Sequence, residues 1–313
     1  MKLNKPKFWE KKGNLISFAL IPLTLLVVIF VFIKKTLTRK INFKIPIICV
    51  GNIYIGGTGK SPTTLLIANE LSKIGKRPAI VRKFYDNHLD EHELLKNYFK
   101  DVILERSRLK GINEAEFKGH DTVILDDGFQ DYKIGKNFNI ICFNENQLDG
   151  NGFVIPSGPL RESLKSLVDV DVVVINGEKN NSFEKKILNI NPNLNIFYSF
   201  YKPINITRFK SKRIMALAGI GNPINFFQIL KKNGLNVEEE LAFPDHYDFK
   251  EKEINNIIKK AKSNNCQILM TEKDYFRIKH FNKKELQFLK VSLEINQIEK
   301  LIDKIKNIYV KKN

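Results

Sequence analysis

The 313-residue sequence predicts an α/β protein with two domains, a parallel-sheet domain and a second, smaller α/β domain, preceded by an apolar N-terminal helix. Two observations support this prediction. Short apolar strands alternate with helical stretches along most of the chain, which is typical of parallel sheets. A glycine-rich turn also joins the first of these strands to a helix. We expect residues 1–40 to form the N-terminal helix with its flanks, 41–205 the first domain, and 206–313 the second.

The composition is that of a folded protein with a large excess of positive charge. Hydrophobic residues make up 43% and charged residues 27% of the chain, which excludes a largely disordered protein. The net charge of +18 favours anionic partners such as nucleotides, phospholipid surfaces or nucleic acid. Cys49, Cys142 and Cys266 are far apart and lack metal-ligand spacing, so we expect them to be buried thiols in a reducing compartment.

Residues 15–33 form an uncharged apolar stretch close to the ~20 residues that cross a bilayer, and we interpret it as a membrane segment. A signal peptide is the first alternative, but no small-residue cleavage site follows. A buried core helix is the second, but the stretch shows no polar face. Lysines flank it on both sides, so charge gives no orientation, and whether it spans the bilayer or lies in one leaflet stays open.

The first predicted strand, residues 45–50, ends at Gly51 and leads into a phosphate-binding loop. Glycines in such a loop present backbone N–H groups to an anion, and the helix that follows, residues 63–72, favours negative charge at its N-terminus. Lys60 then reaches the outer phosphates, and the Ser61 hydroxyl can ligate Mg²⁺. Tyr54 stands where the full motif has its first glycine, so an ordinary glycine turn is the alternative. The residues predicted to bind nucleotide here are Gly56, Gly57, Thr58, Gly59, Lys60 and Ser61.

Two further motifs place charged residues near this loop. A strand over residues 121–125 ends in Asp126 and Asp127, an arrangement that supplies a metal ligand and a polar partner beside a phosphate loop. A simple turn is the alternative there. In the motif at 156–163, Arg161 is suited to a phosphate and Glu162 to a metal ion, although a helix-capping glutamate is equally compatible with the pattern.

A polar stretch over residues 86–93 follows the second predicted strand. Open α/β sheets bind ligands at this carboxyl edge. The stretch contains Asp90, Glu91 and Glu93, and a solvated helix N-terminus is the alternative for each of them.

The second domain repeats the pattern of strand, glycine turn and helix at residues 213–230, without a lysine and serine after the glycines. Asn222 before Pro223 is explained as a helix cap, so we do not expect a second nucleotide site. His246 lies in a predicted loop, and a lone histidine is more often structural than catalytic. The sequence TEKD at 271–274 follows another strand.

Taken together, five motifs resemble the tetraacyldisaccharide 4′-kinase family, the lipid A 4′-kinases. They are GNIYIGGTGKSP at 51–62, LDDGFQ at 125–130, PSGPLRES at 156–163, FPDHY at 243–247 and TEKD at 271–274. The resemblance implies a P-loop kinase-type domain joined by a β-ribbon to a smaller α/β domain. It also implies ATP-dependent phosphorylation of the 4′-hydroxyl of a tetraacyl glucosamine disaccharide 1-phosphate at the cytoplasmic face of the bacterial inner membrane, with the N-terminal helix as the anchor.

The same resemblance implies roles for individual residues. Lys60 and Ser61 serve the phosphates and Mg²⁺, and Asp126 and Glu162 lie at the metal. Asp127 and Gln130 line the site together with Arg161. Asp90 is the acid next to the reacting hydroxyl, and His246 assists it; because this chain is one residue longer here than the family pattern, Glu91 and Glu93 remain alternatives to Asp90.

We therefore predict a lipid-directed kinase whose cofactors are ATP and Mg²⁺ and whose partners are a lipid A precursor and an anionic membrane surface. Two other classes stay as alternatives. A membrane-tethered P-loop NTPase would turn over ATP without a phosphorylated lipid. A nucleic-acid-binding ATPase would bind DNA or RNA with a steep dependence on salt, but no aromatic and basic recognition motif supports it, and we expect no nucleic-acid partner.

Overall fold

The computed structural model describes residues 6–86, 89–245 and 247–310, without the side chain of Asp90. Contacts divide the chain into two compact units. This division differs from the predicted boundaries, because residues 85–98 group with the second unit and the C-terminal residues group with the first. The first unit comprises Met1–Phe84, Phe99–Phe200 and Glu294–Asn313, and the second comprises Tyr85–Tyr98 and Tyr201–Leu293.

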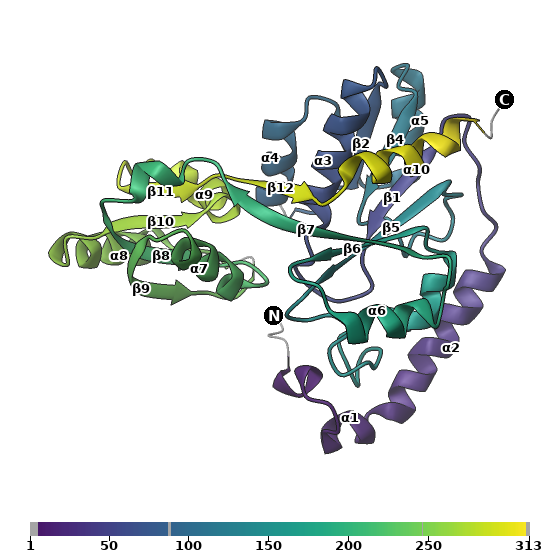
Figure 1. Cartoon of the computed structure of the whole chain (residues 1–313), viewed down its shortest axis with the longest axis horizontal. Helices are drawn as coiled ribbons and strands as arrows, with labels where there is room; N and C mark the ends of the chain where they lie inside the picture. Colours follow the sequence, from purple (N-terminus) through teal and green to yellow (C-terminus); the bar gives the residue numbers. More distant parts are fainter. Residues whose placement is uncertain (1–5, 87–88, 246, 311–313) are drawn as a thin grey trace. The chain divides into compact units, whose positions relative to one another are not determined.

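The first unit is built on an eight-stranded sheet with the strand order β12-β7-β6-β5-β1-β4-β2-β3 (Figure 1). All neighbouring strands between β7 and β3 in this order pair in parallel. The unit boundaries fall within β7 and β12, which are neighbours at one edge of this sheet. The strands are β1 (Ile47–Gly51), β2 (Pro78–Lys83), β3 (Val102–Glu105), β4 (Thr122–Asp126), β5 (Phe138–Asn144), β6 (Val172–Asn176), β7 (Asn195–Pro203) and β12 (Val291–Ile295).

Helices cover this sheet because its central strands are apolar on both faces. All residues of β1, β4 and β6 are buried, as expected for parallel strands between helical layers. The C-terminal helix α10 packs against α3 (Figure 1). The helical elements are α3 (Lys60–Lys73), α5 (Arg108–Phe117), η2 (Leu164–Asp169), α6 (Asn181–Leu188) and α10 (Ile298–Val310).

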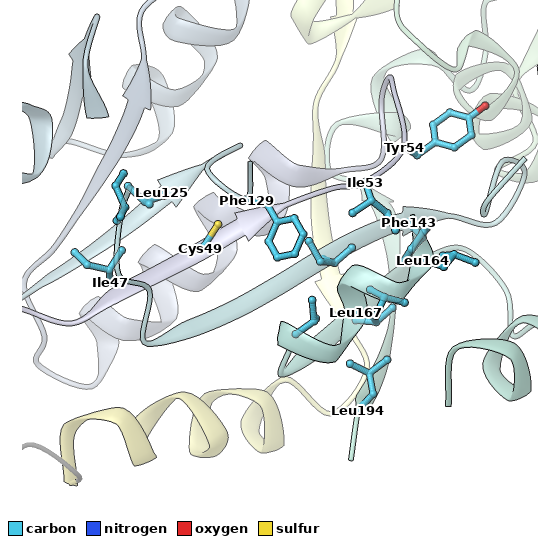
Figure 2. Close-up of a cluster of buried hydrophobic side chains, with 14 of the residues drawn as sticks. Ile47, Cys49, Ile53, Tyr54, Leu125, Phe129, Phe143, Leu164, Leu167 and Leu194 are labelled. Carbon is cyan, nitrogen blue, oxygen red and sulfur yellow. The ribbon is translucent and has the colours of Figure 1, made fainter. Parts of the chain in front are cut away.

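One hydrophobic cluster runs through the first unit and reaches the glycine loop (Figure 2). It begins with Ile47 and Cys49 on β1 and continues through Ile53 and Phe129 to Phe143 on β5. Each of these side chains is at most 6% exposed. The core therefore fixes the strand ends from which the candidate site residues project.

The second unit is a smaller α/β arrangement with a four-stranded parallel sheet in the order β11-β10-β8-β9. Together with the first sheet it confirms the predicted α/β class. Helix α4 belongs to this unit and packs against α9. The elements are α4 (Leu89–Tyr98), η3 (Ile206–Phe209), β8 (Arg213–Ala218), α7 (Pro223–Lys232), β9 (Asn236–Ala242), α8 (Glu251–Ser263), β10 (Gln267–Thr271), α9 (Glu272–Ile278), η4 (Lys279–Phe281) and β11 (Leu286–Leu289).

The apolar N-terminal stretch forms two helices, α1 (Leu15–Ala19) and α2 (Ile21–Leu37), after a short η1 (Lys7–Glu10). The stretch interpreted as a membrane segment, residues 15–33, is not a single helix: it is interrupted at Leu20, and Pro22 opens the second helix. Among the helices of the described residues, none is long and apolar enough to cross a membrane.

These helices bury polar residues and expose apolar ones. The buried residues are Ser17 in α1 and Thr24 in α2, while Leu26 and Phe30 are 64% and 65% exposed. The Thr24 hydroxyl donates to the Ser157 hydroxyl at 2.7 Å. A core helix would bury its apolar side chains, so the core-helix alternative is wrong.

Candidate active site

The loop between β1 and α3 has the backbone geometry of a phosphate-binding loop. Gly56 and Gly59 have positive φ angles of 123° and 89°, which favour glycine. The Asn52 amide donates to the Gly56 carbonyl at 3.2 Å and to the Thr58 hydroxyl at 3.1 Å. Helix α3 then begins at Lys60, so its first N–H groups face the loop. The turn thus contains all the residues predicted to bind nucleotide at this position, namely Gly56, Gly57, Thr58, Gly59, Lys60 and Ser61.

Tyr54, which replaces a glycine of the full motif, packs into the core. Its side chain is 1% exposed and belongs to the hydrophobic cluster of the first unit (Figure 2), and burial raises the pKa of its hydroxyl to about 12. Tyr54 also forms a backbone bridge with Leu160. The next residue, Arg161, donates its N–H to the Ile53 carbonyl at 2.7 Å. These contacts hold Arg161 beside the loop.

Ser61 and Asp126, two of the three residues predicted to lie at the metal, contact each other. The Ser61 hydroxyl donates to Asp126 Oδ2 at 2.9 Å, and Thr64 Oγ1 lies 3.5 Å from Asp126 Oδ1. Arg82 Nη1 donates to the Ser61 hydroxyl at 3.1 Å and forms a close ion pair with Asp126 Oδ2. Asp126 is fully buried at the end of β4, so its charge is balanced within the protein.

Asp127 lies at the centre of a second charged group. Arg161 Nη1 donates to its two carboxylate oxygens at 2.9 and 3.2 Å, and Lys60 Nζ lies 4.0 Å from Oδ1. Arg108 donates to its backbone carbonyl at 2.6 Å. Burial alone raises the pKa of Asp127, but Lys60, Arg161 and Arg108 outweigh it and hold the pKa below its ordinary value. Its φ of 58° lies in the left-handed region, where a non-glycine residue is uncommon.

Glu162 lies in a more enclosed environment than the other acids of the site. It is 4% exposed, and burial raises the pKa of its carboxyl, while Tyr132 and Gln130 interact with the carboxylate and oppose that rise. Its Oε1 atom is buried without a hydrogen-bond partner among the described residues. Gln130 also accepts from Arg161 Nη1 at 3.4 Å, so it connects Glu162 with the group around Asp127.

The two residues predicted to activate the acceptor hydroxyl, Asp90 and His246, lie outside what the structure describes, except for the backbone of Asp90 in α4. Their sequence neighbours are described, and they meet at Lys273 of α9 within the second unit. Lys273 Nζ lies 2.9 Å from Glu91 Oε1 and 3.6 Å from Asp245 Oδ1.

Two arginines of this site, Arg82 and Arg108, were not predicted from the sequence. Arg82 lies at the carboxyl end of β2 in register with Asp126 on the neighbouring strand. Polar residues at the ends of adjacent parallel strands meet at one edge, so this signal was present in the sequence. Arg108 lies in the first turn of α5, where its approach to Asp127 depends on the tertiary fold.

A family model described as tetraacyldisaccharide-1-P 4′-kinase matches residues 16–309. The chain belongs to the tetraacyldisaccharide 4′-kinase family. It is therefore a kinase of lipid A biosynthesis, and the predicted family, enzyme class and activity are confirmed.

Relatives in this family match over nearly their whole length. The tetraacyldisaccharide 4′-kinase of Pelagibacter ubique is 40% identical, with 97% of this chain and 98% of the relative covered. That of Rickettsia canadensis is 34% identical, with 97% of each chain covered. The crystal structure of the Aquifex aeolicus LpxK protein in complex with ATP is similar in fold, with a TM-score of 0.72 at 24% identity over 94% of this chain and 99% of that one.

Proposed function

We propose that the chain performs its kinase reaction with ATP held by the loop over residues 56–61, and that it transfers the γ-phosphate to the 4′-hydroxyl of a tetraacyl disaccharide 1-phosphate. The observation that carries this proposal is the Ser61–Asp126 contact beside the Lys60–Asp127–Arg161 group. Ser61 and Asp126 offer oxygen ligands to a metal ion. Lys60 and Arg161 offer positive charge to phosphate oxygens. A nucleotide triphosphate with its metal ion needs both.

Magnesium fits the oxygens of this site. The Ser61 hydroxyl and Asp126 carboxylate are hard ligands 2.9 Å apart at the N-terminus of α3, and Glu162 has a buried oxygen without a partner among the described residues. Ser61, Asp126 and Glu162 would hold the ion. When bound, Mg²⁺ would supply positive charge that neutralises the negative charge developing during phosphoryl transfer.

Lys60, Arg161 and Asp127 would orient the phosphates. Asp127 holds both cations in place, because its carboxylate contacts Arg161 and faces Lys60. Lys60 is the first residue of α3, so it lies at a helix N-terminus whose dipole also favours negative charge. We assign Gln130 the task of fixing Arg161, since its amide oxygen accepts from that guanidinium.

For the acceptor, we retain Asp90 and His246 as the pair that takes the proton from the 4′-hydroxyl. The hydroxyl oxygen forms the new bond to the γ-phosphorus, the bond to the β-phosphate bridging oxygen breaks, and ADP leaves. The alternatives Glu91 and Glu93 are each engaged in an ion pair, with Lys273 at 2.9 Å and Lys279 at 2.6 Å. These ion pairs support Asp90 over its neighbours as the proton acceptor.

We also propose that α1 and α2 lie in the cytoplasmic leaflet of the inner membrane. The support is their reversed polarity: the polar Ser17 and Thr24 face the protein, while apolar side chains such as Leu26 and Phe30 are exposed. Lys34 and Lys35 in the last turn of α2 suit an anionic lipid surface.

Labelled ATP and the tetraacyl disaccharide 1-phosphate, presented in micelles to the full chain, test this proposal. We expect a labelled lipid product, and strong losses of turnover in both Asp90→Ala and His246→Ala. If the two residues act as a unit, turnover of the double variant should be little lower than turnover of the less active single variant.

Two matched variants, Asp303→Ala and His280→Ala, remove the same side chains from exposed positions outside the site and should keep turnover within about threefold, as exposed substitutions usually do. Release of phosphate without a lipid product would favour the membrane-tethered NTPase. Multiplicative losses for Asp90 and His246 would show that they act separately.

A further inference from the structure

The two oxygens proposed to hold magnesium already contact a cation that belongs to the protein. Arg82 Nη1 donates to the Ser61 hydroxyl at 3.1 Å and to Asp126 Oδ2, while the Ser61 hydroxyl donates to the same Asp126 oxygen at 2.9 Å. The three atoms form a closed triangle. One guanidinium nitrogen therefore bonds both oxygens that a metal ion would use.

The backbone builds this contact into the sheet. Arg82 on β2 and Asp126 on β4 are register partners on adjacent parallel strands, so their side chains project to the same face. Arg82 is 6% exposed and Asp126 is fully buried. The positive charge is therefore held inside the site and not on a mobile surface side chain.

We propose that Arg82 occupies the cation position between Ser61 and Asp126 until magnesium arrives with the nucleotide, so that the protein takes up the metal together with ATP and not as a free ion. A divalent cation that approaches alone meets the charge of Arg82 at contact distance and must displace its hydrogen bonds. The phosphates of ATP bring enough negative charge to balance both cations. This inference rests on the proposed roles of Ser61 and Asp126.

A purely structural role for Arg82 predicts a different outcome. A structural ion pair stabilises the fold, and its loss leaves metal affinity unchanged or lowers it through disorder at Asp126. A cation that competes with the metal has the opposite signature, because its removal makes free metal bind more tightly. Metal affinity without nucleotide therefore separates the two roles.

Binding of Mn²⁺ to the full chain, followed by the loss of the free-ion electron paramagnetic resonance signal, measures this affinity. Without nucleotide, we expect Arg82→Gln to bind Mn²⁺ about tenfold more tightly than the wild type, because a charge at contact distance has been removed. With a non-hydrolysable ATP analogue present, we expect this gap to shrink. Lys83→Gln is the matched control, since it removes one positive charge from the next residue of the same strand, on the opposite face.

Equal or weaker binding of free Mn²⁺ in Arg82→Gln would overturn the proposal, as would an equal gain in Lys83→Gln. If Arg82→Gln does not fold, Arg82→Lys decides: it retains the charge, so we expect free Mn²⁺ to bind within about threefold of the wild type, and a tenfold gain would refute a charge-based role. Asp126→Asn tests the underlying metal assignment separately. If that variant binds Mn²⁺ with the ATP analogue as well as the wild type does, the proposed function fails at Asp126 whatever Arg82 does.

Discussion

The two units contain the same local arrangement, a buried parallel strand followed by a glycine turn and a helix, yet they use its polar groups differently. In the second unit, Asp274 accepts from the Gly219 N–H at 2.9 Å, and Arg277 donates to the Gly219 carbonyl at 3.3 Å. The Asn222 side chain accepts from the Asn225 N–H at the start of α7. In the second unit, the polar groups of the turn are therefore hydrogen-bonded to side chains of the same unit.

In the first unit, the corresponding groups remain open to a ligand. Among the described residues, the backbone N–H groups of residues 57–61 take no part in the turn and cap hydrogen bonds between backbone groups. Lys60 and Arg161 face Asp127 beside the loop. The comparison shows that strand, turn and helix alone do not make a nucleotide site. What distinguishes the first turn is the pair of cations, Lys60 and Arg161, beside its loop.

The largest difference between the two turns should appear on removal of the loop lysine. Lys60→Ala removes a cation that faces the transferring phosphate, so we expect turnover to fall by about 10²-fold or more in the kinase assay. Asn222→Ala at the second turn should instead lower the free energy of unfolding by about 1 kcal/mol through loss of a helix cap, with nucleotide affinity unchanged. Activity of Lys60→Ala within a few-fold of the wild type would show that the loop is not catalytic.

A smaller effect is expected from the two fully buried aspartates, one in each unit. Asp126→Asn should weaken binding of Mn²⁺ with an ATP analogue by about tenfold or more, because an amide is a poorer ligand than a carboxylate. Asp274→Asn should leave that binding unchanged and lower the free energy of unfolding by about 3 kcal/mol, since Arg277 loses its charge partner. Metal titration and urea unfolding of both variants check this. A loss of metal binding in Asp274→Asn would mean that the second turn also serves the metal site.

Sequence alone could predict the parts of the site that depend on local order. Ser61 meets Asp126 because a residue at the start of α3 and one at the end of the adjacent β4 share the carboxyl edge of the sheet. The glycine turn and the helix that follows it are local features in the same sense. Both were predictable because neighbours in the sheet follow from the fold class.

Other features depend on contacts far apart in the chain and could not be predicted. Helix α4 groups with the second unit because it packs against α9, about 180 residues further on. Tyr54 packs into the core where the motif has a glycine, which only the tertiary fold explains. The polar contacts of Ser17 and Thr24 with residues more than 130 positions away likewise became apparent only in the structure.

The smallest expected effect concerns two glutamates that each contact a tyrosine, the buried Glu162 and the half-buried Glu272. Burial raises the pKa of both Glu162 and Glu272. Both oxygens of Glu272 accept from the Tyr98 hydroxyl, at 2.7 and 2.8 Å, whereas Oε1 of Glu162 has no partner among the described residues. Glu272 is thus satisfied within the second unit, whereas Glu162 keeps a buried oxygen that the proposed metal site would use.

This difference predicts that ionisation of Glu162 makes metal affinity depend on pH and that ionisation of Glu272 does not. A metal ion binds the ionised carboxylate and competes with the proton, so affinity for Mn²⁺ with an ATP analogue should rise as pH increases through the raised pKa of Glu162. Below that pKa, affinity should fall by up to about tenfold per pH unit. Glu162→Gln cannot ionise, so its Mn²⁺ affinity should be lower and lack this component, while Glu272→Gln should follow the wild-type profile. Titrations from weakly acidic to neutral pH compare the three proteins on the same analogue, so that the protonation of the phosphates cancels. Superimposable profiles for Glu162→Gln and the wild type would remove Glu162 from the metal site, and a changed profile for Glu272→Gln would remove the distinction between the two glutamates.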